Sequence, residues 1–360
     1  MGDPLTVGII GAGKISAQYA RTLTATADAT LTHVADLDPA RAGLLAADFP
    51  GVRPVLTADL LSSPDVDLVL NLTIPAAHAS VALTALAAGK HVYNEKPLAA
   101  TTAEARRILD VASVAGRRVG CAPDTVLGTG VQTARAALAG GLIGTPVAAT
   151  AFMTTPGHER WHPDPEFYYQ PGGGPLLDMG PYYLTALVTL LGPVRRVTAL
   201  SSTPRATRTI GSGPRAGTTF PVGIPTHETG LLEHASGALT TLLMSFDVWA
   251  AQLPRIEVYG SDGTLHLPDP NHFAGPVRHF AAATESWSEL PELAGYRAAA
   301  RGTGVADLAR ALAAGTGHRA NAGLAYHVLD VMESLQTAAA SAAAVTLTST
   351  CEIPPVVPLE

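Results

Sequence analysis

Short apolar runs alternate with amphipathic segments through the first third of the chain, and this pattern predicts a sheet covered by helices. The runs are apolar at nearly every position, as is typical of parallel strands buried on both faces. Glycine and proline mark the turns between them. We expect strands at residues 6–10, 30–36, 66–72, 91–93 and 118–121, and helices at 39–49, 58–61, 78–88 and 102–115. The pattern therefore predicts an open, doubly wound parallel α/β sheet.

The pattern changes after Asp124, where alternating strands and close hairpin turns predict a mainly antiparallel sheet. The segment 201–223 is rich in Gly, Thr, Arg and Pro, and we expect a mobile loop there. Strands are expected at 146–153, 194–202, 226–234, 238–246, 256–259 and 264–267, and helices at 128–139, 175–191, 305–314 and 321–344. We therefore expect two domains, an α/β domain at 1–124 and an α+β domain with an open sheet at 125–360.

The first apolar run ends in a glycine turn that precedes a predicted helix. Gly11 permits a tight turn, and Gly13 permits close approach of a pyrophosphate to the backbone. The helix would direct its N–H groups and positive dipole end at that anion. Ser16 stands where the dinucleotide fingerprint has its third glycine, and its side chain is small enough for close helix packing. The predicted cofactor contacts in this turn are Gly11, Ala12, Gly13, Lys14 and Ile15.

Asp36 ends the second predicted strand, at the spacing expected for the acid of a dinucleotide site. Its carboxylate can accept hydrogen bonds from the adenosine ribose and would repel a 2′-phosphate. No Arg or Lys is adjacent, because Leu37 and Asp38 follow. We therefore expect NAD rather than NADP, with Asp36 and Leu37 at the ribose. The alternative is that Asp36 only caps the helix that begins at Pro39.

Composition excludes some functions and favours others. Only 15% of the residues are charged and the net charge is −7, which gives no basis for general nucleic-acid binding. Two cysteines are too few for a disulfide framework and are consistent with a reducing compartment. No N-terminal signal sequence is recognisable, because the first strand begins almost at once, and no apolar run is long enough to span a bilayer. We therefore expect a cytoplasmic protein that does not bind membranes.

The carboxyl ends of the predicted parallel strands carry most of the candidate chemistry, since open parallel sheets bind ligands there. Thr73 and Lys96 both follow such strands. The chain has three lysines, at positions 14, 90 and 96, against twenty arginines. A sequence that so strongly favours Arg is expected to retain Lys where a compact ammonium that can lose its proton is needed.

The chain resembles the Gfo/Idh/MocA family of NAD(P)-dependent sugar oxidoreductases over nearly its whole length. The combination of a Glu-Lys-Pro turn after the strand at 91–93 with a later glycine run and aspartate is specific. The motifs that carry the resemblance are Gly11-Ala12-Gly13 with Ser16, Asp36, Thr73-Ile74-Pro75 with His78, Glu95-Lys96-Pro97, and Gly172-Gly173-Gly174 leading to Asp178 and Gly180.

The resemblance implies a Rossmann domain followed by a substrate-binding and oligomerisation domain. It implies that Lys96 contacts both substrate and cofactor, that Pro97 follows a cis peptide bond, and that the open sheet forms a homodimer or homotetramer. The further cofactor contacts expected from the matched turns are Thr73, Ile74, Pro75, His78, Glu95, Lys96 and Pro97.

One position departs from the pattern of many family members, which have His four residues after the aspartate. Tyr182 stands there, as in the branch that includes glucose–fructose oxidoreductase and dihydrodiol dehydrogenase. Asp178 and Tyr182 would share one face of a continuous helix, although Pro181 could kink it. We expect Lys96, Asp178 and Tyr182 to be catalytic and to contact substrate. The alternatives are that Asp178 caps a helix and that Tyr182 is a core residue.

The segment 158–162 matches the zinc motif H-E-x-x-H, which requires a long helix. Pro156-Gly157 and Pro163 leave little room for one, so we expect no metal. A loop that presents Trp161 and His162 to a polyol is favoured, because aromatic faces stack on sugar rings and imidazole bonds hydroxyls. Asp124, at the predicted domain junction, is a further candidate for substrate contact.

The predicted reaction is transfer of a hydride between NAD and a secondary hydroxyl of a sugar, sugar derivative or cyclitol. Tyr182 would accept the hydroxyl proton, Lys96 would bond the same oxygen, and Asp178 would orient the substrate or Lys96. One alternative is glycoside cleavage through transient sugar oxidation with recycled NAD. Another is a non-catalytic protein that senses sugar or NAD.

Overall fold

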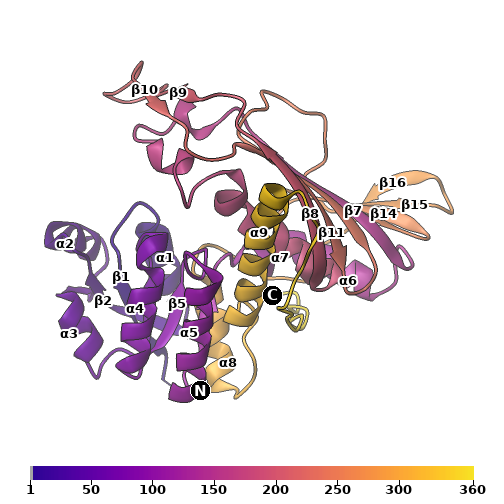
Figure 1. Cartoon of the computed structure of the whole chain (residues 1–360). Coiled ribbons are helices and arrows are strands. Elements are labelled where there is room, and N and C mark those ends of the chain that lie inside the picture. The colour runs from indigo at the N-terminus through magenta and orange to yellow at the C-terminus, as the bar shows by residue number, and fades with distance from the viewer. Residues whose placement is uncertain (1–2) are drawn as a thin grey trace. The chain divides into compact units, whose positions relative to one another are not determined.

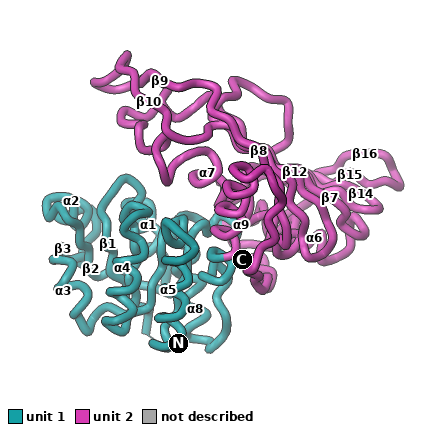
Figure 2. Tube along the Cα trace, in the orientation of Figure 1, with its two compact units in different colours: residues 1–128, 298–326 teal, residues 129–297, 327–360 magenta. Residues whose placement is uncertain are grey.

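A computed structural model describes residues 3–360, and contacts within the chain divide these residues into two compact units (Figure 2). The first unit comprises the described residues up to 128 together with 298–326. The second comprises 129–297 together with 327–360. The division differs from the expected domains at 1–124 and 125–360, because the chain returns to the first unit at 298–326.

The first unit contains a six-stranded sheet in the order β3-β2-β1-β4-β5-β6, and all of its strand pairs are parallel (Figure 1). The doubly wound parallel sheet expected from the sequence is confirmed. Its strands are β1 (Leu5–Ile10), β2 (Ala29–Ala35), β3 (Arg53–Pro54), β4 (Leu68–Asn71), β5 (His91–Asn94) and β6 (Val119–Cys121). The helices between them are α1 (Ser16–Ala25), α2 (Pro39–Ala47), α3 (Thr57–Ser62), α4 (Pro75–Ala87) and α5 (Thr102–Ala115).

The returning segment contains α8 (Thr303–Ala313) and is held by hydrogen bonds to the end of the parallel sheet. Asp124 Oδ2 accepts hydrogen bonds from the backbone N–H groups of Gly302 and Gly304, at 2.8 and 3.1 Å. Beyond α8, the Cys121 N–H donates to the carbonyl of Ala320 at 3.0 Å. These bonds complete the β6 edge, which explains why a segment so distant in sequence belongs to this unit.

The second unit is built on a nine-stranded sheet in the order β16-β15-β14-β13-β7-β12-β11-β8-β17. The β7–β12 pair is parallel and the others are antiparallel. The open, mainly antiparallel sheet expected from the sequence is therefore confirmed. Its strands are β7 (Pro146–Thr154), β8 (Val194–Ser202), β11 (His227–His234), β12 (Leu239–Ser245), β13 (Ile256–Gly260), β14 (Gly263–Leu267), β15 (Arg278–Ala281), β16 (Ser286–Glu289) and β17 (Val345–Thr346).

Helices cover one face of this sheet and leave the other face open. The covering helices are α6 (Thr129–Ala139), α7 (Pro175–Leu191) and α9 (Ala322–Ser341). Gly230 of β11 permits the approach of α9, because a Cβ there would lie 2.7 Å from a methyl group of Leu335. On the opposite face, Leu200, Leu231 and Leu239 are exposed on adjacent strands. A sheet face in contact with water is expected to carry mainly polar residues, so these three exposed leucines are a departure from that pattern.

The expectation of a mobile loop over 201–223 is corrected by the structure. This segment contains the paired strands β9 (Thr207–Thr209) and β10 (Thr219–Pro221). Arg208 points into the unit, and its side chain is only 1% exposed. The composition is typical of a loop, but buried ion pairs made by Arg208 order the hairpin. The structure also contains the short 3-10 helices η1 (Thr125–Leu127), η2 (His158–Arg160) and η3 (Glu166–Tyr169).

Candidate active-site residues in the two units

The turn after β1 has the backbone that a bound pyrophosphate requires. Gly11 has a φ of 104°, and a Cβ there would lie 2.7 Å from the carbonyl carbon of Leu72. A Cβ at Gly13 would meet nothing within 4 Å, so the space above this turn is open. Within the described residues, no side chain caps the start of α1 at Ile15. The open turn and the uncapped helix start therefore fit a dinucleotide phosphate.

Asp36 is bonded to the same turn. Its Oδ2 accepts a hydrogen bond from Ala12 N at 2.7 Å, and its Oδ1 accepts one from Asp38 N at 2.9 Å. Asp38, not Asp36, is the residue that caps α2, because its side chain accepts from Ala40 N. The alternative role of Asp36 as the helix cap is therefore wrong. Leu37 is fully exposed beside it.

His78 ties together two of the turns that were predicted to contact the cofactor. Its Nδ1 lies 2.6 Å from the carbonyl oxygen of Pro97, and its Nε2 lies 3.1 Å from that of Thr73. The Lys96–Pro97 bond is cis, as the family resemblance implied. His78 is fully buried, and burial lowers the pKa of its imidazole. It therefore supports the turns from within the unit, whereas Ile74 and Pro75 are exposed.

Glu95 is held by a tyrosine that sequence reasoning did not single out. The Tyr19 hydroxyl donates to Glu95 Oε1 at 2.7 Å, and Glu95 Oε2 accepts from the backbone N–H of Lys96 at 2.8 Å. Burial raises the pKa of Tyr19, so this hydroxyl stays a donor. The pair fixes the backbone that carries Lys96, whose side chain is half-buried.

Asp124 lies buried between the end of the parallel sheet and the returning segment. Its side chain is fully buried, and it bonds the returning segment at Gly302 and Gly304. Burial raises the pKa of its carboxyl, and the Arg301 guanidinium and the two amide donors partly offset that effect. The carboxylate is therefore buried and holds the returning segment in place, and its contact with a substrate stays a prediction.

In the second unit, Asp178 is paired with a histidine that was not among the predicted site residues. His158 Nε2 lies 2.9 Å from Asp178 Oδ2. The helix α7 that carries Asp178 continues through Pro181, and Tyr182 follows one turn later on the same face. His158 is marked in the sequence by the H-E-x-x-H segment, but its partner Asp178 is visible only in the structure.

The first turn of α7 is bonded to a second buried carboxyl group. Glu228 of β11 accepts a hydrogen bond from the backbone N–H of Leu176, and burial raises its pKa to about 7. No sequence motif marked Glu228, because its role depends on the sheet that packs against the helix. The bond helps to fix the start of the helix that carries Asp178.

The remaining predicted residues of this segment differ in exposure. Trp161 is 58% exposed, and its ring lies edge-on to that of His158 with centroids 5.3 Å apart. His162 is buried, and its Nδ1 accepts from Asp164 N at 3.1 Å, which makes it part of a local turn. Trp161 is therefore the more accessible candidate for contact with a ligand.

The glutamate of the H-E-x-x-H segment forms an ion pair with a buried arginine. Glu159 Oε1 lies 3.0 Å from Arg208, and the segment forms only the 3-10 turn η2. Within residues 3–360, no group of three or more His, Cys, Asp or Glu side chains has the arrangement of a metal site. That the protein holds no metal stays a prediction.

Comparison with family models identifies both parts of the chain. Residues 5–122 match the oxidoreductase family with an NAD-binding Rossmann fold, and residues 131–266 match the GFO/IDH/MocA C-terminal domain. An enzyme named inositol 2-dehydrogenase 3, from Saccharopolyspora erythraea, is 30% identical over 289 residues, which cover 79% of each chain. The chain belongs to the Gfo/Idh/MocA oxidoreductase family. Its first unit is accordingly an NAD-binding Rossmann domain.

Other relatives match less of the chain or only its fold. The inositol 2-dehydrogenase of Acidothermus cellulolyticus is 40% identical over 114 residues, which cover 31% of this chain and 33% of that enzyme's length. A crystal structure of an NAD-binding oxidoreductase from Klebsiella pneumoniae superposes with a TM-score of 0.84 at 23% identity. That match covers 97% of this chain and all of the other, and it agrees with the fold described above.

We expect Asp36→Ala combined with Leu37→Arg to shift coenzyme preference toward NADP. The change removes the carboxylate that would repel a 2′-phosphate and adds a guanidinium at an exposed position that could bind it. The ratio of kcat/KM for the two coenzymes should move by about 10- to 100-fold, as for a charged hydrogen bond. The single variant Leu37→Arg is the control and should move it less. A wild-type enzyme that already prefers NADP would contradict the role given to Asp36.

Proposed function

We propose that this protein oxidises a secondary hydroxyl of a sugar, sugar derivative or cyclitol with NAD as the hydride acceptor. The observation that carries the proposal is the turn after β5, which holds Lys96 and is bonded through His78 to the Thr73 turn of the NAD-binding domain. The names of the relatives, which include inositol 2-dehydrogenases, support a polyol substrate.

The residues of the chain supply binding and proton transfer. When bound, NAD supplies the acceptor for the hydride. Tyr182 takes the proton of the reacting hydroxyl, Lys96 stabilises the developing alkoxide with its ammonium charge, and Asp178 orients the substrate. Trp161 offers an aromatic face to the ring of the substrate. Reduction of the corresponding ketone uses the same groups in reverse.

The test is a panel of cyclitols, aldoses and anhydrosugars, assayed with NAD by the absorbance of NADH. If the protein is a dehydrogenase as proposed, at least one member of the panel should yield one NADH for each molecule of oxidised product. Consumption of a glycoside without net NADH would instead establish cleavage with a recycled cofactor. No turnover across the panel, with NAD bound, would overturn the proposal in favour of a sensing protein.

We also propose that the protein forms a homodimer or homotetramer through the open face of the nine-stranded sheet. Leu200, Leu231 and Leu239 are exposed on three adjacent strands of this face, and apolar residues grouped in this way favour an interface.

Within residues 3–360, no helix is both long and apolar enough to span a bilayer. The cytoplasmic location predicted from the sequence stays a prediction.

Replacement of Leu231 by Asp should weaken this assembly. A carboxylate buried in an apolar interface would lose its hydration without a partner. We expect sedimentation velocity to show a shift toward the monomer at micromolar concentration. Val114→Asp is the matched control, because Val114 is an exposed apolar residue on α5 of the first unit. Unchanged sedimentation of the Leu231 variant would exclude this face as the interface.

A further inference from the structure

We propose that His158 is a positioning residue of the proposed active site, because it fixes the orientation of the Asp178 carboxylate. The inference rests on the proposed function, in which Asp178 orients the substrate. It adds a residue, and a supporting network, that the motifs of the chain did not indicate. The two side chains come from η2 and α7, twenty residues apart in the sequence.

The pair has the geometry of a directed hydrogen bond. His158 Nε2 and Asp178 Oδ2 are 2.9 Å apart, and the two side chains are 11% and 18% exposed. A carboxylate at neutral pH only accepts, so the imidazole donates its Nε2–H, and the bond thereby selects one tautomer of the ring. Such a bond sets the plane of the carboxylate, which a freely rotating aspartate would not keep.

Aromatic rings hold the imidazole in place. The ring of His158 lies 4.5 Å from that of Tyr168 and 4.5 Å from that of Phe246, measured between centroids. Both contacts restrict rotation of the histidine ring. The Nε2–H is therefore directed at Asp178 by packing as well as by attraction.

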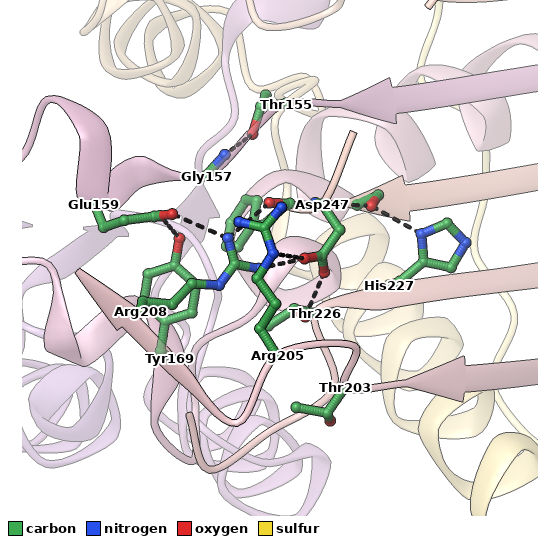
Figure 3. A network of polar contacts seen from close by, with 12 residues as sticks. Thr155, Gly157, Glu159, Tyr169, Thr203, Arg205, Arg208, Thr226, His227 and Asp247 are labelled. Atoms are coloured by element: carbon green, nitrogen blue, oxygen red, sulfur yellow. Dashed lines mark hydrogen bonds and ion pairs between the residues drawn. The ribbon is translucent and has the colours of Figure 1, made fainter. Parts of the chain in front are cut away.

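A buried polar network that includes Tyr169, Glu159 and Arg208 (Figure 3) also fixes the backbone of His158. The backbone N–H of His158 donates to the Tyr169 hydroxyl at 3.1 Å, and that hydroxyl in turn donates to Glu159 Oε2. Glu159 Oε1 accepts from Arg208 at 3.0 Å. Tyr169 thus links the position of His158 to an ion pair that is almost completely buried.

Arg208 anchors this network to the sheet. Its second guanidinium nitrogen donates to Asp247 Oδ1 at 2.6 Å, and Asp247 Oδ2 accepts from the Thr226 hydroxyl at 2.5 Å. Arg208, Glu159 and Asp247 are 1%, 6% and 9% exposed, so each charge depends on its partners for compensation. A continuous series of contacts therefore runs from the β9–β10 hairpin to Asp178.

The test compares two replacements of His158. His158→Gln keeps an N–H donor at a similar reach, and His158→Leu removes it with a similar volume. We expect the Leu variant to lose about 10- to 100-fold in kcat on the best substrate of the panel, the cost of one hydrogen bond to a charged group. The Gln variant should remain within about threefold of wild type. The KM for NAD should be unchanged in both.

Two controls separate positioning from folding. His266→Gln alters another histidine–carboxylate pair of the same unit, with Glu257 at 3.4 Å, and should leave kcat unchanged. Tyr169→Phe removes the hydroxyl that holds the His158 backbone and should lower kcat less than His158→Leu does. Wild-type turnover of the Leu variant would overturn the proposal. A Gln variant as inactive as the Leu variant would also overturn the proposal, because it would show that an N–H donor to Asp178 does not maintain turnover.

A second measurement does not depend on turnover. Imidazole 15N chemical shifts of the wild type should show the Nε2–H tautomer for His158, and Asp178→Ala should remove this preference. A mixed tautomer in the wild type would overturn the inference. If the wild type binds NAD but oxidises no member of the panel, the proposed function fails, and the tautomer result still decides whether His158 fixes Asp178.

Discussion

Lys96→Ala is expected to lower kcat by about 10²- to 10⁴-fold, the range of a positioned proton-handling group. The ammonium lies in the turn after β5 and is the compact cation that would stabilise an alkoxide. The alanine variant keeps the backbone N–H that bonds Glu95 Oε2, and the bond between His78 and the Pro97 carbonyl also remains. The turn should therefore persist, and the loss should appear in the chemical step.

The measurement combines steady-state kinetics with NAD binding by calorimetry. NAD affinity should change little, because the glycine turn and Asp36 are intact. Lys90→Ala is the matched control, since Lys90 Nζ donates to the Ser63 carbonyl at 2.6 Å, away from the turns of the site. It should have wild-type turnover. Near-normal kcat in Lys96→Ala would remove Lys96 from the catalytic residues.

Tyr182→Phe should lower turnover by roughly 10²-fold or more. The variant should also lose the increase of the oxidation rate that we expect as pH rises from neutral. A tyrosine hydroxyl ordinarily has a pKa near 10, so a tyrosine that accepts the substrate proton works better as pH rises from neutral. The oxidation rate of the wild type should increase in that range. Phenylalanine retains the packing of the ring in α7 and removes only the hydroxyl.

The adjacent tyrosine provides the control for this prediction. Tyr183 is fully buried on another face of α7, and Tyr183→Phe should keep both turnover and the alkaline rise. Tyr182→His would introduce the base that many relatives have and should recover part of the activity at a lower pH optimum, since imidazole titrates near 6.5. A Phe variant with wild-type turnover would leave another group as the proton acceptor.

The first unit was largely predictable because its signals are local. Each apolar run and the turn that follows it are adjacent in sequence, so Gly11, Asp36 and Lys96 could be placed at strand ends without knowledge of the tertiary fold. The cis bond before Pro97 came from family resemblance rather than from the residues. The bonds that hold the turns, from Tyr19 and His78, join residues far apart and were visible only in the structure.

The second unit was less predictable because its key contacts are not local. The pairing of His158 with Asp178 depends on how an irregular segment folds back onto α7, and sequence periodicity carries no information about that. The β9–β10 hairpin was missed for the same reason. Each of its strands has three residues within a segment rich in Gly and Pro, and the ion pairs of Arg208 with Glu159 and Asp247 order it from a distance.

The return of the chain at 298–326 has a consequence for synthesis on the ribosome. Most of the NAD-binding unit precedes the second unit in the sequence, yet the segment that bonds Asp124 and β6 is translated only after most of the second unit. Asp124 therefore lacks its two amide partners until Gly302 and Gly304 have been translated. A domain that starts first must in this way wait for most of its neighbour to be translated, and a fragment released at residue 128 would leave one sheet edge unprotected.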